Sequence, residues 1–111
     1  MKFKIKYFTS VRSTNDEAIK YIKKNNLNPT IILAKIQTNG KGTMGKKWVS
    51  RKGNIFMSIY FMIDEKKIKF EQFSILNPYI IKKILKKYTD QKIKIKLPND
   101  ILIKSKKLCG I

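Results

Sequence analysis

The feature that most constrains the fold is an alternation of charged and apolar residues at two places in the chain, which is strict at the second place. Residues 3–9 (FKIKYFT) and 92–97 (KIKIKL) both alternate with a period of two. That period is typical of β-strands with one buried face. Further apolar runs of strand length lie at 31–36, 55–63, 101–103 and 108–111.

Two segments have helical patterns instead. The first begins at Thr14, which we expect to cap the helix while Glu17 completes a capping box, and it ends in the Asn25-Asn26 region. The second runs from Phe70 to Tyr88, and Pro78 is expected to kink it or to start its second part. The resulting order, β-α-β-loop-β-α-β-β-β, indicates an α+β or mixed α/β fold.

Charge is the strongest compositional bias. Lysine and arginine number 26 against 7 acidic residues, which gives a formal charge of +19. Only Arg12 and Arg51 are arginines, whereas base recognition favours the planar guanidinium group. The lysines are spread along the chain, which favours a solvated surface with weak polyanion binding over specific nucleic-acid recognition. A basic nucleic-acid-binding module stays open as the alternative from another class.

Composition also excludes several kinds of site. The chain has no histidine, which excludes Ser-His and Cys-His nucleophile pairs and finger-type zinc sites. Its single cysteine, Cys109, cannot form an internal disulfide. No apolar run reaches the ~18–20 residues of a membrane span, and the first residues lack a secretory apolar run. The length of 111 residues favours one small domain, and we expect no membrane partner and a cytoplasmic location.

A glycine-rich stretch between two predicted strands is the first candidate for chemistry. Gly40, Gly42 and Gly45 fall within six residues, so we expect a flexible loop whose backbone N–H groups can surround an anion. The stretch lacks the P-loop spacing, and no helix follows it as in a dinucleotide fingerprint. A mobile hairpin loop without function is the alternative explanation.

Three other constellations also have structural explanations. Ser13-Thr14-Asn15 can bind a small polar group or only cap a helix. Asn99 and Asp100 can supply oxygens to Mg²⁺ beside a nucleotide, or only form a turn. Lys107 can act as a fixed cation, or lie in solvent.

In their order, these pieces resemble the catalytic domain of biotin–protein ligases. The similar segments are Ser13–Asn15, Gln37–Trp48, Gly53–Ser58, Lys96–Asp100 and Lys106–Ile111. The resemblance implies an α+β fold with a mixed, largely antiparallel sheet and helices packed on one side, related to class II aminoacyl-tRNA synthetases and incomplete here. It also implies that residues 1–111 are the N-terminal portion of that domain, with no DNA-binding domain and no C-terminal domain.

The resemblance implies a two-step reaction. The carboxylate of biotin attacks the α-phosphate of ATP with Mg²⁺, which gives biotinyl-5'-adenylate and pyrophosphate. A lysine of the biotin carboxyl carrier protein of acetyl-CoA carboxylase then accepts biotin. ATP, biotin and Mg²⁺ are thus the expected small-molecule partners, and a homodimer is left open. A lipoate or other acyl ligase of the same fold is the alternative within the family.

The resemblance also assigns roles by position. Lys107 corresponds to the catalytic lysine, and Asp100 to a metal-binding carboxylate. The residues expected at biotin are Ser13, Thr14, Asn15, Gln37, Lys41, Gly42, Thr43, Lys107 and Gly110. Those expected at ATP or the adenylate are Gly40, Lys41, Gly42, Thr43, Gly45, Lys46, Lys47, Trp48, Asn99 and Asp100.

Three departures from the family pattern affect these expectations. Thr43 and Met44 replace arginines of many members, and Leu97 replaces a tryptophan. The family's domain continues beyond the segment that corresponds to Ile111. Because that continuation completes the family's sheet, we expect weak or no activity of this chain alone.

Overall fold

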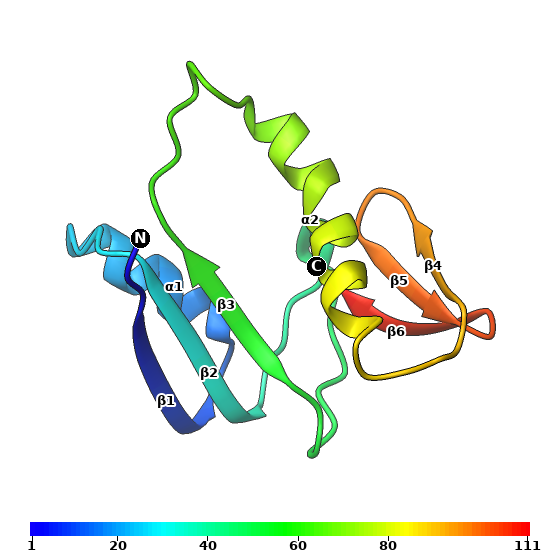
Figure 1. The fold of residues 1–111 in the computed structure, drawn as a ribbon. Helices are drawn as coiled ribbons and strands as arrows, with labels where there is room; N and C mark the ends of the chain where they lie inside the picture. The colour runs from blue at the N-terminus through cyan, green and yellow to red at the C-terminus, as the bar shows by residue number, and fades with distance from the viewer. The chain divides into compact units, whose positions relative to one another are not determined.

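A computed structural model describes all 111 residues, which form two compact units, Met1–Met62 and Ile63–Ile111. The order of strands and helices along the chain is the predicted one (Figure 1). Of the four strand pairs, one is parallel and three are antiparallel, so the mixed α+β class is confirmed.

The first unit is a three-stranded sheet with one helix. Its elements are β1 (Lys4–Val11), α1 (Thr14–Lys23), β2 (Thr30–Gln37) and β3 (Phe56–Tyr60). The sheet order is β1-β2-β3, with β1 parallel and β3 antiparallel to β2. A parallel pair requires a crossover connection, and α1 supplies it.

The core of the first unit lies between α1 and the sheet (Figure 1). Ala18 of α1 is buried with Ile32 of β2 and Tyr60 of β3, and Phe8 and Tyr21 pack against them. Because successive strand residues alternate between the two faces, the inward-facing Ile32 and Ala34 are buried while Lys35 is exposed. This packing fixes the start of α1 beside the end of β2.

The second unit is an antiparallel meander with a helix. It contains α2 (Phe70–Leu85), β4 (Ile93–Lys96), β5 (Asp100–Ile103) and β6 (Lys106–Gly110), in the sheet order β4-β5-β6. Ile93 and Ile101 are its most buried strand residues, and α2 packs against β4 and β5. The helix continues through Pro78 as one element and ends at Leu85, earlier than the predicted Tyr88. Neither α1 nor α2 is long and apolar enough to cross a membrane.

The predicted cap of α1 is wrong by one residue. Ser13 is the N-cap, with extended backbone angles, and its hydroxyl accepts from the N–H groups of Asn15 and Asp16. Thr14 is instead the first helical residue, because its N–H and hydroxyl bind Gln37 and its hydroxyl also contacts Ser58. The Thr14 side chain, which the local pattern predicted to cap the helix, therefore forms hydrogen bonds with residues of β2 and β3 instead.

Candidate functional site

A hydrogen-bonded network joins α1, β2 and β3 in the first unit. The amide oxygen of Gln37 accepts from the backbone N–H of Thr14 at 2.8 Å and from its hydroxyl at 3.1 Å. The Thr14 hydroxyl also lies 2.8 Å from the hydroxyl of Ser58 on β3. Thr14 is buried, and the Gln37 amide satisfies one of the N–H groups that the start of a helix leaves without an intrahelical partner.

The chemistry of these groups sets the direction of each hydrogen bond. The Thr14 hydroxyl has a single proton, and it donates that proton to the Gln37 oxygen, which can only accept. In the contact between Thr14 and Ser58, the Ser58 hydroxyl is therefore the donor. Ser58 retains lone pairs that can accept a hydrogen bond from a ligand.

The amide nitrogen of Gln37 points the other way, toward the base of the glycine-rich loop. It donates to the hydroxyl of Ser50 at 3.0 Å, and that hydroxyl in turn lies 3.4 Å from the carbonyl oxygen of Trp48. Its second N–H bond has no acceptor within the protein. The half-buried network thus leaves one acceptor, on Ser58, and one donor, on Gln37.

The glycine-rich loop is closed by its own backbone. Trp48 N–H donates to Gly40 C=O at 2.9 Å, and Gly42 N–H donates to Lys46 C=O at 2.7 Å. A single 3₁₀ turn, Thr43–Gly45, forms the tip, where Met44 and Gly45 both have positive φ. The loop is therefore a small hairpin with a hydrogen-bonded backbone, whereas the sequence predicted a flexible loop around an anion or, as the alternative, a mobile hairpin loop.

The lysines of this loop differ in their partners. The ammonium group of Lys41 lies 2.8 Å from the Asp16 carboxylate, in the first turn of α1. Lys46 and Lys47 are exposed and form no ion pair. Positive charge thus lies at both ends of the hairpin, and the ion pair of Lys41 with Asp16 connects the hairpin to α1.

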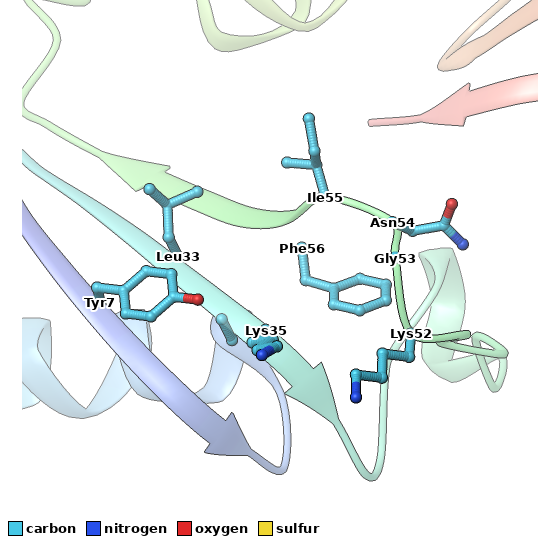
Figure 2. Close-up of a pocket in the computed structure, with 9 residues that line it drawn as sticks. Tyr7, Leu33, Lys35, Lys52, Gly53, Asn54, Ile55 and Phe56 are labelled. Carbon is cyan, nitrogen blue, oxygen red and sulfur yellow. The ribbon is translucent and has the colours of Figure 1, made fainter.

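A shallow pocket of about 290 Å³ lies elsewhere in the first unit, and none of the predicted site residues lines it. Figure 2 shows Tyr7, Leu33 and Lys35 from the sheet on one part of its wall. The segment Lys52–Phe56, which leads into β3, forms the rest of the wall. Thr14 and Gln37 therefore lie outside this pocket.

In the second unit, the hairpin of β5 and β6 brings several predicted residues together. The Lys107 ammonium group lies 3.1 Å from the Asp100 carboxylate, and Gly110 pairs with Asp100 across the two strands. Asn99 and Ile111 bind each other through Ile111 N–H to Asn99 C=O at 2.9 Å and Asn99 Nδ2 to Ile111 C=O at 3.0 Å. A register shift between Ile101 and Leu102 lets Lys107 pair opposite Leu102.

Cys109 lies beside this cluster. Burial raises the pKa of its thiol, and the neighbouring Asp100 carboxylate raises it further, because both disfavour the thiolate. The thiol is therefore a poor nucleophile at neutral pH. Cys109 is half-buried and is not part of the buried core, whereas the sequence predicted it to be a core residue.

The metal prediction rests on one carboxylate. No group of three or more His, Cys, Asp or Glu side chains is placed to hold a metal ion. Mg²⁺ is commonly held by one or two carboxylates together with substrate phosphates and waters. Asp100 fits that arrangement only as a single protein ligand, and its Oδ1 atom is already paired with Lys107.

Sequence reasoning missed three residues that the structure places in these contacts. Ser50 had no recognisable signal, and Ser58 lay in a quoted motif without a role. Asp16 was part of the predicted helix start, and its pairing with Lys41 depends on tertiary structure. Of the predicted residues, Asn15 is exposed and its side chain forms no hydrogen bond within the protein.

Comparison with known protein families shows what the sequence of the chain is similar to. Residues 7–111 match the Biotin/lipoate A/B protein ligase family. The chain belongs to this family.

Individual relatives agree with that membership. The bifunctional ligase/repressor BirA of Bacillus subtilis is 32% identical over 106 residues, which cover 95% of this chain and 33% of that protein. BirA of Escherichia coli is 29% identical over 80 residues, which cover 71% of this chain and 25% of BirA. The chain thus spans a third or less of the length of these curated relatives.

Solved structures agree as well. The biotin acetyl coenzyme A carboxylase synthetase of Helicobacter pylori, with bound biotinylated ATP, matches 96% of this chain with a TM-score of 0.85 and 25% identity. The match covers 52% of that protein. The biotin protein ligase of Aquifex aeolicus, in complex with biotin and ATP, matches with a TM-score of 0.79 and 27% identity, over 96% of this chain and 44% of the other. The fold is that of biotin protein ligases.

Proposed function

We propose that this chain carries biotin-binding and biotin-activating residues of a biotin–protein ligase. In the proposed first step, a carboxylate oxygen of biotin attacks the α-phosphorus of ATP. The bond to the β-phosphate oxygen breaks, pyrophosphate leaves, and biotinyl-5'-adenylate forms. In the second step, the amine of a lysine on the biotin carboxyl carrier protein attacks the acyl carbon, and AMP leaves.

The observation that carries the proposal is the polarity of the network around Thr14. Ser58 has a free acceptor, and Gln37 has a free donor in its second N–H. A cyclic urea such as the ureido ring of biotin presents the complementary groups, N–H and C=O, side by side. Apolar acids such as lipoate lack both groups, so the pattern favours biotin over lipoate.

The positively charged lysines of the glycine-rich loop complement the anionic end of the ligand. Biotin carries a carboxylate, and the adenylate adds a phosphate, so cations that surround them favour binding and stabilise developing negative charge. Lys41, Lys46 and Lys47 supply such cations in the first unit. We assign Gly40, Gly42, Thr43, Gly45 and Trp48 to the loop that covers the activated acid, which must be kept from water.

In the second unit, we assign Lys107 to the charge that develops at the α-phosphate. Asp100 holds its ammonium group in one place, which orients the cation before the ligand arrives. Asn99 and Gly110 border the same end of the hairpin. Asp100 would also hold Mg²⁺ together with phosphate oxygens, and the metal would neutralise phosphate charge.

Binding is the direct test of this proposal. Calorimetric titration of the purified chain with biotin, lipoic acid and biotinyl-5'-adenylate should show binding of both biotin compounds and none of lipoic acid. Thr14→Val removes the hydroxyl and should weaken biotin binding, while Thr30→Val, a buried threonine in the same unit, serves as a matched control. Preference for lipoic acid, or binding of nucleic acid alone, would contradict the proposal.

Mass spectrometry provides a second readout. The chain is incubated with biotin, ATP and Mg²⁺, and biotinyl-5'-adenylate and biotinylated carrier protein are measured separately. The expected yield is low, and it should fall further in Lys107→Ala. A yield in Lys107→Ala equal to that of the unchanged chain would remove Lys107 from the proposed step.

A further inference from the structure

Ser50 lies just beyond the glycine hairpin and contacts its base. Its hydroxyl accepts a hydrogen bond from the Gln37 side chain at 3.0 Å and lies 3.4 Å from the Trp48 carbonyl oxygen, to which it donates. One hydroxyl therefore links the end of β2 to the segment that follows the loop.

The orientation of the Gln37 amide follows from its two neighbours. The backbone N–H of Thr14 can only donate, so it requires the amide oxygen on the helix side. The nitrogen then faces Ser50, which accepts one of its two N–H bonds. Ser50 thereby determines where the remaining N–H of Gln37 points.

Gly40 makes this arrangement possible. A Cβ atom at Gly40 would stand 2.4 Å from the Ser50 hydroxyl oxygen, 2.8 Å from the Trp48 carbonyl oxygen and 3.0 Å from the Gln37 nitrogen. These contacts are too short for any larger residue without movement of the three groups. The first glycine of the loop is thus required by close packing against Ser50 and its two partners.

We propose that Ser50 is a positioning residue that couples the base of the glycine hairpin to the amide of Gln37. The inference rests on the proposed function in one respect, since it takes Gln37 as the residue that binds the ligand. When Ser50 loses its hydroxyl, one donor of Gln37 loses its acceptor and the amide is held from the Thr14 side alone. The loop base then no longer sets the direction of the remaining N–H.

The test compares Ser50→Ala with Ser50→Thr, which keeps a hydroxyl. Ser74→Ala is the matched control, because the Ser74 hydroxyl also donates to a backbone carbonyl, at 2.9 Å, but lies on the exposed face of α2. The first readout needs no ligand. In ¹H–¹⁵N NMR spectra of the full chain, the side-chain amide signals of Gln37 should move in Ser50→Ala, return in Ser50→Thr and stay in place in Ser74→Ala.

The second readout is biotin affinity by calorimetry. Ser50→Ala should weaken binding about five- to a hundredfold, which corresponds to leaving a part-buried donor unpaired, and Ser50→Thr should recover most of it. If the unchanged chain binds no biotin, the proposed function fails, and the NMR comparison alone decides the role of Ser50. Gln37 signals that are the same in Ser50→Ala and in the unchanged chain would overturn the inference.

Discussion

At the scale of single residues, Thr14 illustrates how tertiary contacts override a local signal. A threonine before a helical segment favours capping, but here its hydroxyl binds Gln37 and Ser58 across 23 and 44 residues of sequence. Ser13 caps the helix instead, a contact worth about 1 kcal/mol. The helix start was thus predicted from sequence, but the identity of the cap depended on partners that no local pattern contains.

The glycines of the loop differ in what they require, and this gives the first prediction. Gly40→Ala should lower the free energy of unfolding of the first unit by about 1–3 kcal/mol, because its Cβ would meet three groups at 3.0 Å or less. At Gly42 the nearest atom, the Lys46 carbonyl oxygen, lies 3.4 Å from the added Cβ. Gly42→Ala should therefore cost much less in urea denaturation, and equal losses would contradict the packing described at Gly40.

The thiol of Cys109 gives a second prediction. Because burial and the Asp100 carboxylate both raise its pKa, the reaction with a maleimide should increase with pH at higher values than for an unperturbed cysteine. Asp100→Asn removes one of the two causes, so its rate profile should shift toward lower pH while burial keeps it above the ordinary range. A profile in the unchanged chain that matches a free cysteine peptide would refute this assignment.

At the scale of elements, the sequence predicted every α-helix and strand in order, because each is an alternating segment, an apolar run of strand length or a helical pattern, whereas the 3₁₀ turn Thr43–Gly45 was not predicted. The ends were less predictable. β1 continues to Val11 because it pairs with β2 as far as Gln37, and the predicted strand at 55–63 is paired only over Phe56–Tyr60. Pairing partners set these limits, and a single strand's sequence does not specify them.

The proximity of Lys107 and Asp100 could also not be predicted from the patterns of the single strands. The two residues lie in separate sequence motifs, and only the register of the β5–β6 hairpin, with its shift between Ile101 and Leu102, brings their side chains to 3.1 Å. The ion pair between Lys107 and Asp100 is therefore already formed without a ligand. Its role in phosphate chemistry stays a prediction.

The ion pair between the glycine hairpin and α1 gives a third prediction. Asp16→Asn removes the partner of Lys41, so acrylamide should quench the fluorescence of Trp48, the only tryptophan, more strongly. The effect should be modest, because exposed ion pairs contribute less than about 1 kcal/mol. About 0.5 M salt should act in the same direction on the unchanged chain.

Glu17→Gln is the control for this experiment. It breaks a neighbouring ion pair, with Lys20 at 2.7 Å, that does not touch the hairpin. Quenching should therefore stay at the level of the unchanged chain. If both variants increase quenching equally, the Lys41–Asp16 contact does not hold the hairpin.

At the scale of the whole molecule, the charge of +19 has consequences of its own. Most lysines lie in solvent, and a surface of this kind attracts polyanions in a salt-dependent way. Experiments must therefore distinguish specific ligand binding from non-specific attraction by this charge. Only a few lysines form ion pairs with acidic residues. Lys41 and Lys107 are two of them, each paired with an aspartate.

The main proposal is that anionic groups of biotinyl-5'-adenylate contact Lys41 in the first unit and, as a separate assignment, Lys107 in the second unit. Lysine acetylation followed by mass spectrometry tests it most directly, with Lys23 and Lys94 as exposed controls outside the predicted site. Biotinyl-5'-adenylate should protect Lys41 and, in an independent comparison, Lys107, and it should leave the controls reactive. Protection of neither lysine, or equal protection of all four lysines by any polyanion, would contradict these assignments.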